Sequence, residues 1–84
     1  MIKILYFARI KEGLGMGQES IDIPAGVADV ASLTALLRTR GTAWQTELAP
    51  GKSLRVAINQ TMVSIDAAIK DGDEIAYFPP VTGG

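Results

Sequence analysis

The sequence predicts an α+β fold in which one main helix packs on one face of a mixed sheet of four to five strands. Several short segments alternate apolar and polar residues with a period of two, as half-buried strands do. One central segment, between residues 29 and 41, instead spaces its aliphatic residues at helical intervals. A length of 84 residues leaves room for one domain, and a chain this small must commit most of its apolar residues to the core.

The first strand is predicted over residues 2–8, where Ile2, Ile4 and Tyr6 share the face expected to point inward. Residues 9–18 contain glycines at positions 13, 15 and 17, and we expect a loop there because glycine breaks regular structure. The alternative is a helical turn around Ile10 and Leu14. A second strand is predicted over residues 20–23, and Pro24 ends it.

The main helix is predicted to begin after Asp29, whose carboxylate can accept hydrogen bonds from the free amides of the first turn. Gly41 is well placed to follow the C-cap, where glycine is favoured. Trp44 and Leu48 are four positions apart and indicate a further short helix. The apolar stripe of the main helix consists of Val30, Leu33, Leu36 and Leu37.

Residues 54–58 predict a third strand, and Met62 and Val63 a brief fourth one. A turn of sequence Asp-Gly-Asp at 71–73 precedes the last strand, over residues 74–78, in which Ile75 and Tyr77 are expected to face inward. With the first and last strands as a parallel pair at the centre of the sheet, this order is that of the β-grasp, or ubiquitin-like, fold. We therefore expect a domain at residues 1–78 and an extended, flexible tail at residues 79–84.

Composition excludes the familiar kinds of side-chain chemistry. The chain has no cysteine and no histidine, which excludes disulfides, thiolate nucleophiles, Ser-His pairs and imidazole metal ligands. The formal net charge is -1 and the basic residues are scattered, which argues against a nucleic-acid partner. Neither a secretory signal nor an apolar run of the ~20 residues that span a bilayer is present, so we expect a cytoplasmic protein without a membrane partner.

The tail, Pro79-Pro80-Val81-Thr82-Gly83-Gly84, is the unusual element. Its two prolines stop the strand and favour extended polyproline geometry. Six residues at ~3.1 Å each reach on the order of 19 Å. Because the last two residues have no side chains, the terminal carboxylate can enter a channel that side chains would block. The alternative is a frayed terminus, which most domains have.

An exposed aromatic patch is predicted beside this tail. In the first strand Phe7 alternates with the inward residues, and in the last strand Phe78 does the same. In a parallel pair both phenylalanines lie at the same end of the sheet, on its solvent side, and Met62 extends the patch. Contiguous exposed apolar residues indicate a partner site. The alternative is that residues 42–53 cover them.

Three stretches then carry a family resemblance: MIKILYFA at residues 1–8, VAINQ at 56–60 and DGDEIAYFPPVTGG at 71–84. Over nearly its whole length the chain resembles the MoaD-like family, the small sulfur-carrier subunits of molybdopterin synthase. The last stretch is the specific one, whereas the middle of the chain matches more loosely.

The resemblance implies that the carboxylate of Gly84 is adenylated by an adenylyltransferase similar to the ubiquitin-activating enzymes, and that a sulfur donor enzyme converts it to a thiocarboxylate. ATP and magnesium belong to the activating enzyme, since the glycine-rich residues 13–17 lack the Gly-Lys-Ser/Thr continuation of a phosphate-binding loop. We expect the chain to bind no cofactor or metal itself and to be inactive alone.

The resemblance also implies a partner, the large catalytic subunit of molybdopterin synthase, in a heterotetramer of two small and two large subunits. There the thiocarboxylate sulfurates cyclic pyranopterin monophosphate. Phe7, Met62 and Phe78 then form the contact surface for the large subunit. The inserted tail consists of Pro80, Val81, Thr82 and Gly83, with Gly84 at the reacting end.

Three other functions fit the same features. The chain can be a sulfur carrier for thiazole or another sulfurated product, although its length and the Pro-Pro-Val-Thr sequence before Gly-Gly argue against the thiazole type. It can be a ubiquitin-like modifier whose carboxylate is joined to lysines of target proteins. It can also be an interaction module with an incidental tail.

Overall fold

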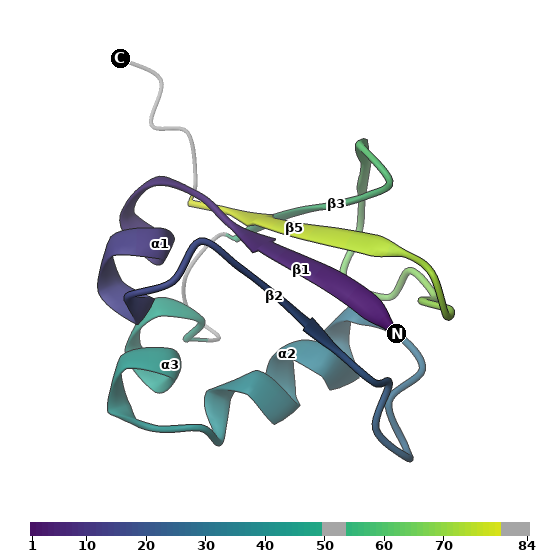
Figure 1. Cartoon of the computed structure of the whole chain (residues 1–84), viewed down its shortest axis with the longest axis horizontal. Coiled ribbons are helices and arrows are strands. Elements are labelled where there is room, and N and C mark those ends of the chain that lie inside the picture. Colours follow the sequence, from purple (N-terminus) through teal and green to yellow (C-terminus); the bar gives the residue numbers. More distant parts are fainter. Residues whose placement is uncertain (50–53, 80–84) are drawn as a thin grey trace.

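The computed structural model describes residues 1–49 and 54–79, which form a five-stranded mixed sheet of order β2-β1-β5-β3-β4 (Figure 1). At its centre β1 and β5 run parallel, with Lys3 opposite Glu74 and Tyr6 opposite Tyr77. The other neighbouring strands are antiparallel. The parallel centre confirms the β-grasp prediction. The strands are β1 (Ile2–Tyr6), β2 (Gln18–Ile21), β3 (Arg55–Ile58), β4 (Thr61–Val63) and β5 (Glu74–Phe78).

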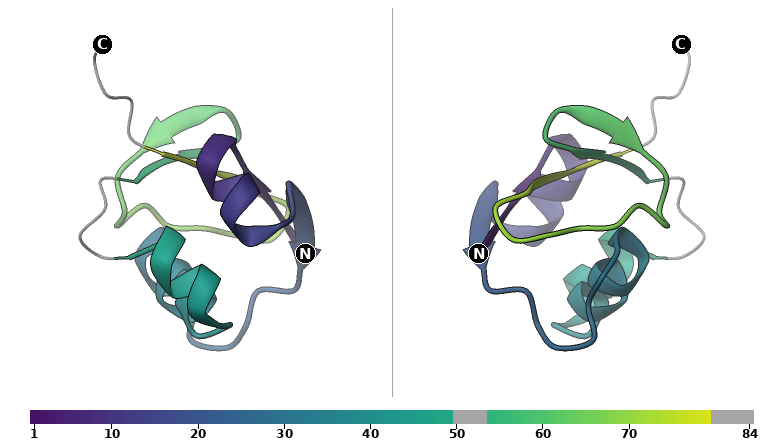
Figure 2. Two further views of the ribbon diagram at one scale, coloured as in Figure 1. Left: turned by 90° about the vertical axis from the view of Figure 1, so that its left-hand side faces the viewer. Right: turned by 90° about the vertical axis from the view of Figure 1, so that its right-hand side faces the viewer.

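Three helices accompany the sheet: α1 (Ala8–Leu14), α2 (Val30–Arg38) and α3 (Thr42–Glu47). The longest, α2, lies under one face of the sheet with α3 beside it, and α1 packs on α3 (Figures 1 and 2). Among the residues described, no helix combines the length and the apolar character needed to cross a bilayer.

The core fills the space between α2 and the sheet, and the predicted inward residues line it. Their side chains are at most 1% exposed, because the alternation of a strand directs every second residue to the same face. The helices add Ile10, Val30, Leu33 and Leu37 to this core, and its remaining members are Leu48, Val56 and Ile69. The inward residues of β1 and β5 are Ile2, Ile4, Tyr6, Ile75 and Tyr77.

The start of α2 confirms the predicted N-cap. The Asp29 carboxylate accepts a hydrogen bond from the Ser32 N–H (2.8 Å), and the Ser32 hydroxyl accepts one from the Asp29 N–H (3.2 Å). These reciprocal bonds satisfy amides that have no partner within the helix. The bonds from the Ser32 hydroxyl and N–H also lower the pKa of Asp29. The predicted end of the helix was wrong by one residue, since Thr39 is its C-cap and Gly41 is instead the N-cap of α3.

The expected loop at residues 9–18 was wrong in its first half, where α1 confirms the alternative of a helical turn around Ile10 and Leu14. Gly15 does not break this helix but ends it, with φ +75° and its N–H bonded to the Lys11 carbonyl (3.0 Å). Gly13 lies inside the helix, and glycine fits this position because the Glu47 side chain occupies the space that a Cβ would need. The buried Ile10 anchors α1 to the core. In this segment glycine serves helix packing and helix termination.

Strand β2 begins and ends two residues earlier than predicted. Its register with β1 places Ile21 opposite Ile2 and Gln18 opposite Leu5. Ile23 packs against the core from outside the strand. The predicted strands in the second half of the chain, including the brief β4, are confirmed, as is the short helix α3.

A buried hydroxyl pair between α2 and β5 gives a test of this packing. Thr34 Oγ1 donates to the Val30 carbonyl (2.7 Å), so the Tyr77 hydroxyl must donate to Thr34 (2.8 Å). Thr34→Val leaves the buried Tyr77 hydroxyl without a hydrogen-bond acceptor and should lower the free energy of unfolding by about 2 kcal/mol. Tyr77→Phe leaves Thr34 bonded to the Val30 carbonyl and should lower it by about 1 kcal/mol. Urea titrations of both variants check this order, and a larger loss in Tyr77→Phe would contradict it.

Candidate functional site

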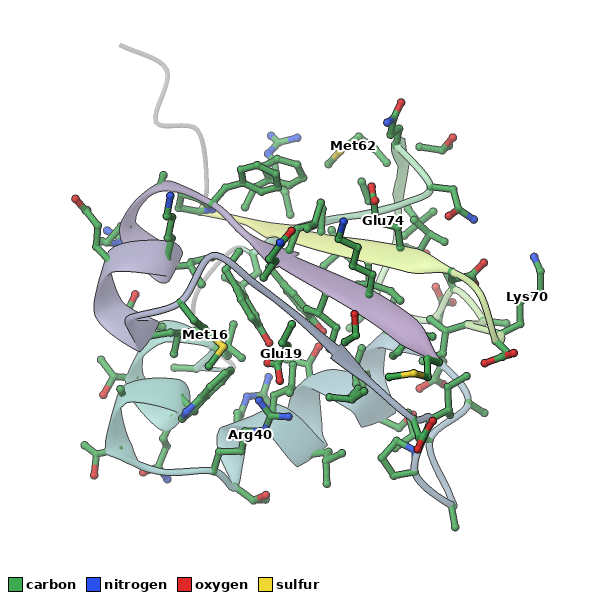
Figure 3. The ribbon with its side chains drawn as sticks, in the orientation of Figure 1. Met16, Glu19, Arg40, Met62, Lys70 and Glu74 are labelled. Atoms are coloured by element: carbon green, nitrogen blue, oxygen red, sulfur yellow. The ribbon has the colours of Figure 1, made fainter. Side chains whose placement is uncertain are left out.

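The face of the sheet away from α2 carries an apolar strip that we call the outer face: Leu5, Phe7, Ala57, Met62, Ala76 and Phe78. Strand alternation directs these residues away from the core. The registers bring them together, since Ala76 lies opposite both Leu5 and Ala57, and Ala57 lies opposite Met62. Met62 stands on this side of the sheet in Figure 3, while Glu19 and Arg40 lie on the helix side.

The two phenylalanines predicted to form a patch are in direct contact. Their rings stack with centroids 4.8 Å apart and an interplanar angle of 3°. The Phe7 N–H donates to the Tyr77 carbonyl (3.2 Å), which extends the parallel pairing by one residue. Phe7 remains 40% exposed and Met62 53% exposed, so the patch presents apolar area to solvent.

Backbone geometry directly after Phe7 fixes the end of this strip. Ala8 has φ +53°, a left-handed conformation that costs a non-glycine residue roughly 1 kcal/mol. It turns the chain from β1 into α1, and the first helical amides bond back to the Phe7 carbonyl. The sequence carries no signal for this turn, because alanine is not a residue that favours positive φ.

Between Phe78 and Met62 the outer face is hollowed, with a volume of about 280 Å³. The floor consists of Ala57 and Ala76, which face each other across β3 and β5 and are 4% and 7% exposed. Because both side chains are methyl groups, the floor lies lower than the walls. The hollow is lined by Leu5, Phe7, Ala57, Gln60, Met62, Glu74, Ala76 and Phe78.

Charged residues of both signs border this apolar hollow. Lys3 and Glu74 lie opposite each other on β1 and β5, and Arg55 lies opposite Phe78 on β3. Figure 3 shows Glu74 on the same side of the sheet as Met62. An apolar centre with a polar rim is the arrangement of protein–protein interfaces, in which a partner side chain fills the central pocket.

The predicted site residues thus divide into two groups. Phe7, Met62 and Phe78 come together on the outer face, whereas Pro80, Val81, Thr82, Gly83 and Gly84 lie outside the described residues. Of the segment 42–53, which was the alternative cover for the patch, residues 42–47 form α3 on the opposite side of the sheet, and residues 50–53 are not described.

Within residues 1–49 and 54–79 no group of three or more acidic side chains could hold a metal ion.

Sequence reasoning missed the floor and part of the wall of the hollow. Leu5, Ala57 and Ala76 have the same strand parity as the predicted phenylalanines, and this signal could have found them. Gln60 could not be found in this way, because it belongs to the turn between β3 and β4.

Comparisons with known proteins agree with this geometry. Residues 4–84 match the model of the ThiS family. The molybdopterin synthase sulfur carrier subunit of Escherichia coli (strain K12) is 42% identical over 84 residues, which is 100% of both chains. These matches confirm the family resemblance carried by residues 1–8, 56–60 and 71–84.

Two solved structures have a similar fold, one of a protein named as a modifier and one of a complex between two subunits. The small archaeal modifier protein 1 of Haloferax volcanii superposes with a TM-score of 0.76 at 25% identity, covering 95% of this chain and 97% of that one. A protein–protein complex of subunits 1 and 2 of the molybdopterin-converting factor from Helicobacter pylori 26695 gives a TM-score of 0.66 at 26% identity, covering 99% and 97%.

Proposed function

Because the chain belongs to the ThiS family, we propose that it is a sulfur carrier in molybdopterin synthesis, the small subunit that delivers sulfur to a larger, catalytic one. The observation that carries this proposal is the 42% identity to a molybdopterin synthase sulfur carrier subunit over the full length of both chains. The outer face supports it, since it offers an apolar docking area beside the strand that leads into the tail.

The reacting group is the main-chain carboxylate of Gly84. A carboxylate is a poor electrophile, so it attacks ATP on the activating enzyme, releases pyrophosphate and becomes an acyl adenylate. Sulfide delivered by a donor enzyme then attacks the acyl carbon and displaces AMP, and loss of its proton leaves a thiocarboxylate. ATP and magnesium are bound by the activating enzyme in this scheme. We propose that these steps take place in the cytoplasm, where ATP is available.

Sulfur transfer then takes place inside the large subunit. The residues from Pro80 to Gly83 extend into its active site, where the thiocarboxylate sulfur of Gly84 bonds to cyclic pyranopterin monophosphate. Water then hydrolyses the bond between Gly84 and the sulfur, which leaves the sulfur on the pterin precursor and returns the Gly84 carboxylate. Phe7, Met62 and Phe78 hold the two subunits together, in a heterotetramer of two small and two large subunits. The complex of subunits 1 and 2 from Helicobacter pylori supports a partner of this kind.

The intact mass of the protein, purified from cells that make molybdenum cofactor, tests the proposal. We expect a fraction of the chains to show the mass of one oxygen-to-sulfur exchange, which fragmentation places at Gly84. Cells that lack the activating enzyme provide the control and should yield the carboxylate alone. If the terminus is always an unmodified carboxylate while cofactor is being made, the proposal fails.

A second candidate function is protein modification, and the likeness to a small archaeal modifier protein favours it. In that case the activated carboxylate is joined to lysine side chains of target proteins. The same mass measurement separates the two, because isopeptide adducts have a higher mass and survive thiol treatment, whereas a thiocarboxylate appears only on the free chain.

A further inference from the structure

The hairpin between β3 and β4 carries one wall of the hollow. Its two turn residues, Asn59 and Gln60, have φ values of +50° and +70°. Positive φ at both central positions is the geometry of a two-residue type I′ turn, for which asparagine is a favoured first residue. The hairpin projects Gln60 and Met62 to the border of the hollow, so the position of the hairpin determines the shape of the hollow.

Asn59 ties this hairpin to the start of β5 by three hydrogen bonds. Its N–H donates to the Glu74 carbonyl (2.8 Å), its side-chain amide donates to Asp73 Oδ1 (3.0 Å), and its side-chain oxygen accepts from the Glu74 N–H (3.0 Å). A carboxylate only accepts and a backbone N–H only donates, so this is the one orientation of the amide that satisfies both partners.

Asp73, which receives the amide, is itself fixed in place. It is 4% exposed, its carboxylate also accepts from the Lys70 N–H (2.9 Å), and its backbone carbonyl accepts from the Lys3 N–H of β1 (3.0 Å). Burial alone would raise the pKa of Asp73, but the hydrogen bonds from Lys70 and Asn59 outweigh it and hold the pKa below its usual value. Asp73 thus offers the hairpin a charged anchor that is joined to the central strands.

We propose that Asn59 is a positioning residue for partner docking, which holds the β3–β4 hairpin against the start of β5 so that Gln60 and Met62 wall a preformed hollow for an apolar side chain of the large subunit. This inference rests on the proposed function. The bonds of Asn59 cross from the wall, on the hairpin, to β5, which supplies Ala76 of the floor and Phe78 of the other wall. A preformed pocket avoids the cost of ordering its wall at the moment of binding.

The variant Asn59→Gly tests the proposal, because glycine accepts the positive φ of the turn but removes both side-chain bonds. If the displaced wall then no longer touches the partner side chain in the complex, we expect the Kd for the large subunit to rise about fivefold, which corresponds to about 1 kcal/mol. Isothermal titration calorimetry of the full chain against the purified large subunit from the same organism measures this Kd.

A second variant separates the amide from the turn. Asn59→Asp is nearly isosteric, and aspartate also tolerates positive φ, but it places a carboxylate against that of Asp73. We expect Asn59→Asp to weaken binding more than Asn59→Gly. If only the turn conformation mattered, the two variants would bind equally well.

A double-mutant cycle shows whether Asn59 acts through the wall. Met62→Ala should weaken binding in the parent chain and much less in the Asn59→Gly chain, because there the wall is already displaced. The control is Ser32→Ala, which opens the cap of α2 on the other side of the sheet and lowers stability without changing Kd.

The outcomes of these experiments distinguish a failure of the positioning role from a failure of the proposed function. If the parent chain does not bind the large subunit, the proposed function fails. If the parent binds and Asn59→Gly binds with the same Kd, or if the effects of Asn59→Gly and Met62→Ala simply add, the positioning role is overturned and the proposed function stands. A loss of affinity in Ser32→Ala equal to that in Asn59→Gly would attribute the effect to stability and also overturn the positioning role.

Discussion

Removal of Gly84 alone is expected to abolish sulfur transfer to the pterin precursor while leaving the folded domain unchanged. The deletion draws the terminal carbon back by one residue, about 3.5 Å. A misplacement of about 1 Å at a reacting centre already costs on the order of 100-fold in rate, so we expect a loss of at least that size. The described core, from Ile2 to Tyr77, contains none of the deleted atoms and should not be affected.

Two measurements on the truncated chain separate chemistry from folding. Single-turnover assays with the large subunit measure sulfur transfer, and thermal unfolding measured by circular dichroism serves as the control, since both chains should melt at the same temperature. Mass spectrometry after incubation with the activating enzyme, ATP, magnesium and the sulfur donor shows which step is lost. Normal sulfur transfer by the truncated chain would rule out Gly84 as the reacting residue.

Phe78→Asp is expected to weaken binding to the large subunit by at least about 30-fold, or ~2 kcal/mol, the size of an interface hot spot. Phe78 stacks on Phe7 and forms part of the wall of the hollow, so the substitution removes an aromatic contact and places a charge where the partner excludes water. Phe78→Leu keeps the apolar surface and should bind nearly as well as the parent chain. Calorimetric titration of both variants gives the comparison.

The matched control for this substitution is Ile65→Asp. Ile65 is 62% exposed, more than Phe7, but its carbonyl accepts a hydrogen bond from Ala31 of α2, which places it on the helix side of the sheet. The same change of an apolar residue to aspartate should therefore leave the Kd unaltered there. Equal losses in Ile65→Asp and Phe78→Asp would indicate a nonspecific effect of charge, and an unchanged Kd in Phe78→Asp would give Phe78 another role.

The strands could be predicted because their signals are local. In β5 the alternation of Ile75 and Tyr77 with Ala76 and Phe78 both locates the strand and assigns its two faces, and Asp29 marks the start of α2 without reference to the rest of the chain. The proximity of Phe7 and Phe78 could be predicted by combining that alternation with a parallel central pair, whereas the stacking of their rings is seen only in the structure.

The missed features depend on contacts between distant residues. Helix α1 is stable because Ile10 is buried and because Gly13 admits the Glu47 side chain of α3, and neither contact is visible in residues 9–18 themselves. The floor of the hollow requires the β3–β5 register that pairs Ala57 with Ala76. The anchoring of Asn59 requires that the 71–73 turn lie beside a hairpin more than ten residues earlier in the chain, so the sequence indicated only a turn.

The central position of β5 has a consequence for the order in which the protein folds. Loop closure is slow when paired segments are far apart in sequence, and here the last strand must insert between β1, which is synthesised first, and β3. Until it does, β1 and β3 have no common neighbour in the sheet, and Phe78 of β5 is separated from Phe7 at the end of β1. A nascent or unfolded chain therefore displays no stacked aromatic pair. A large subunit that binds the stack selects carriers whose folding is complete, and so is not occupied by immature ones.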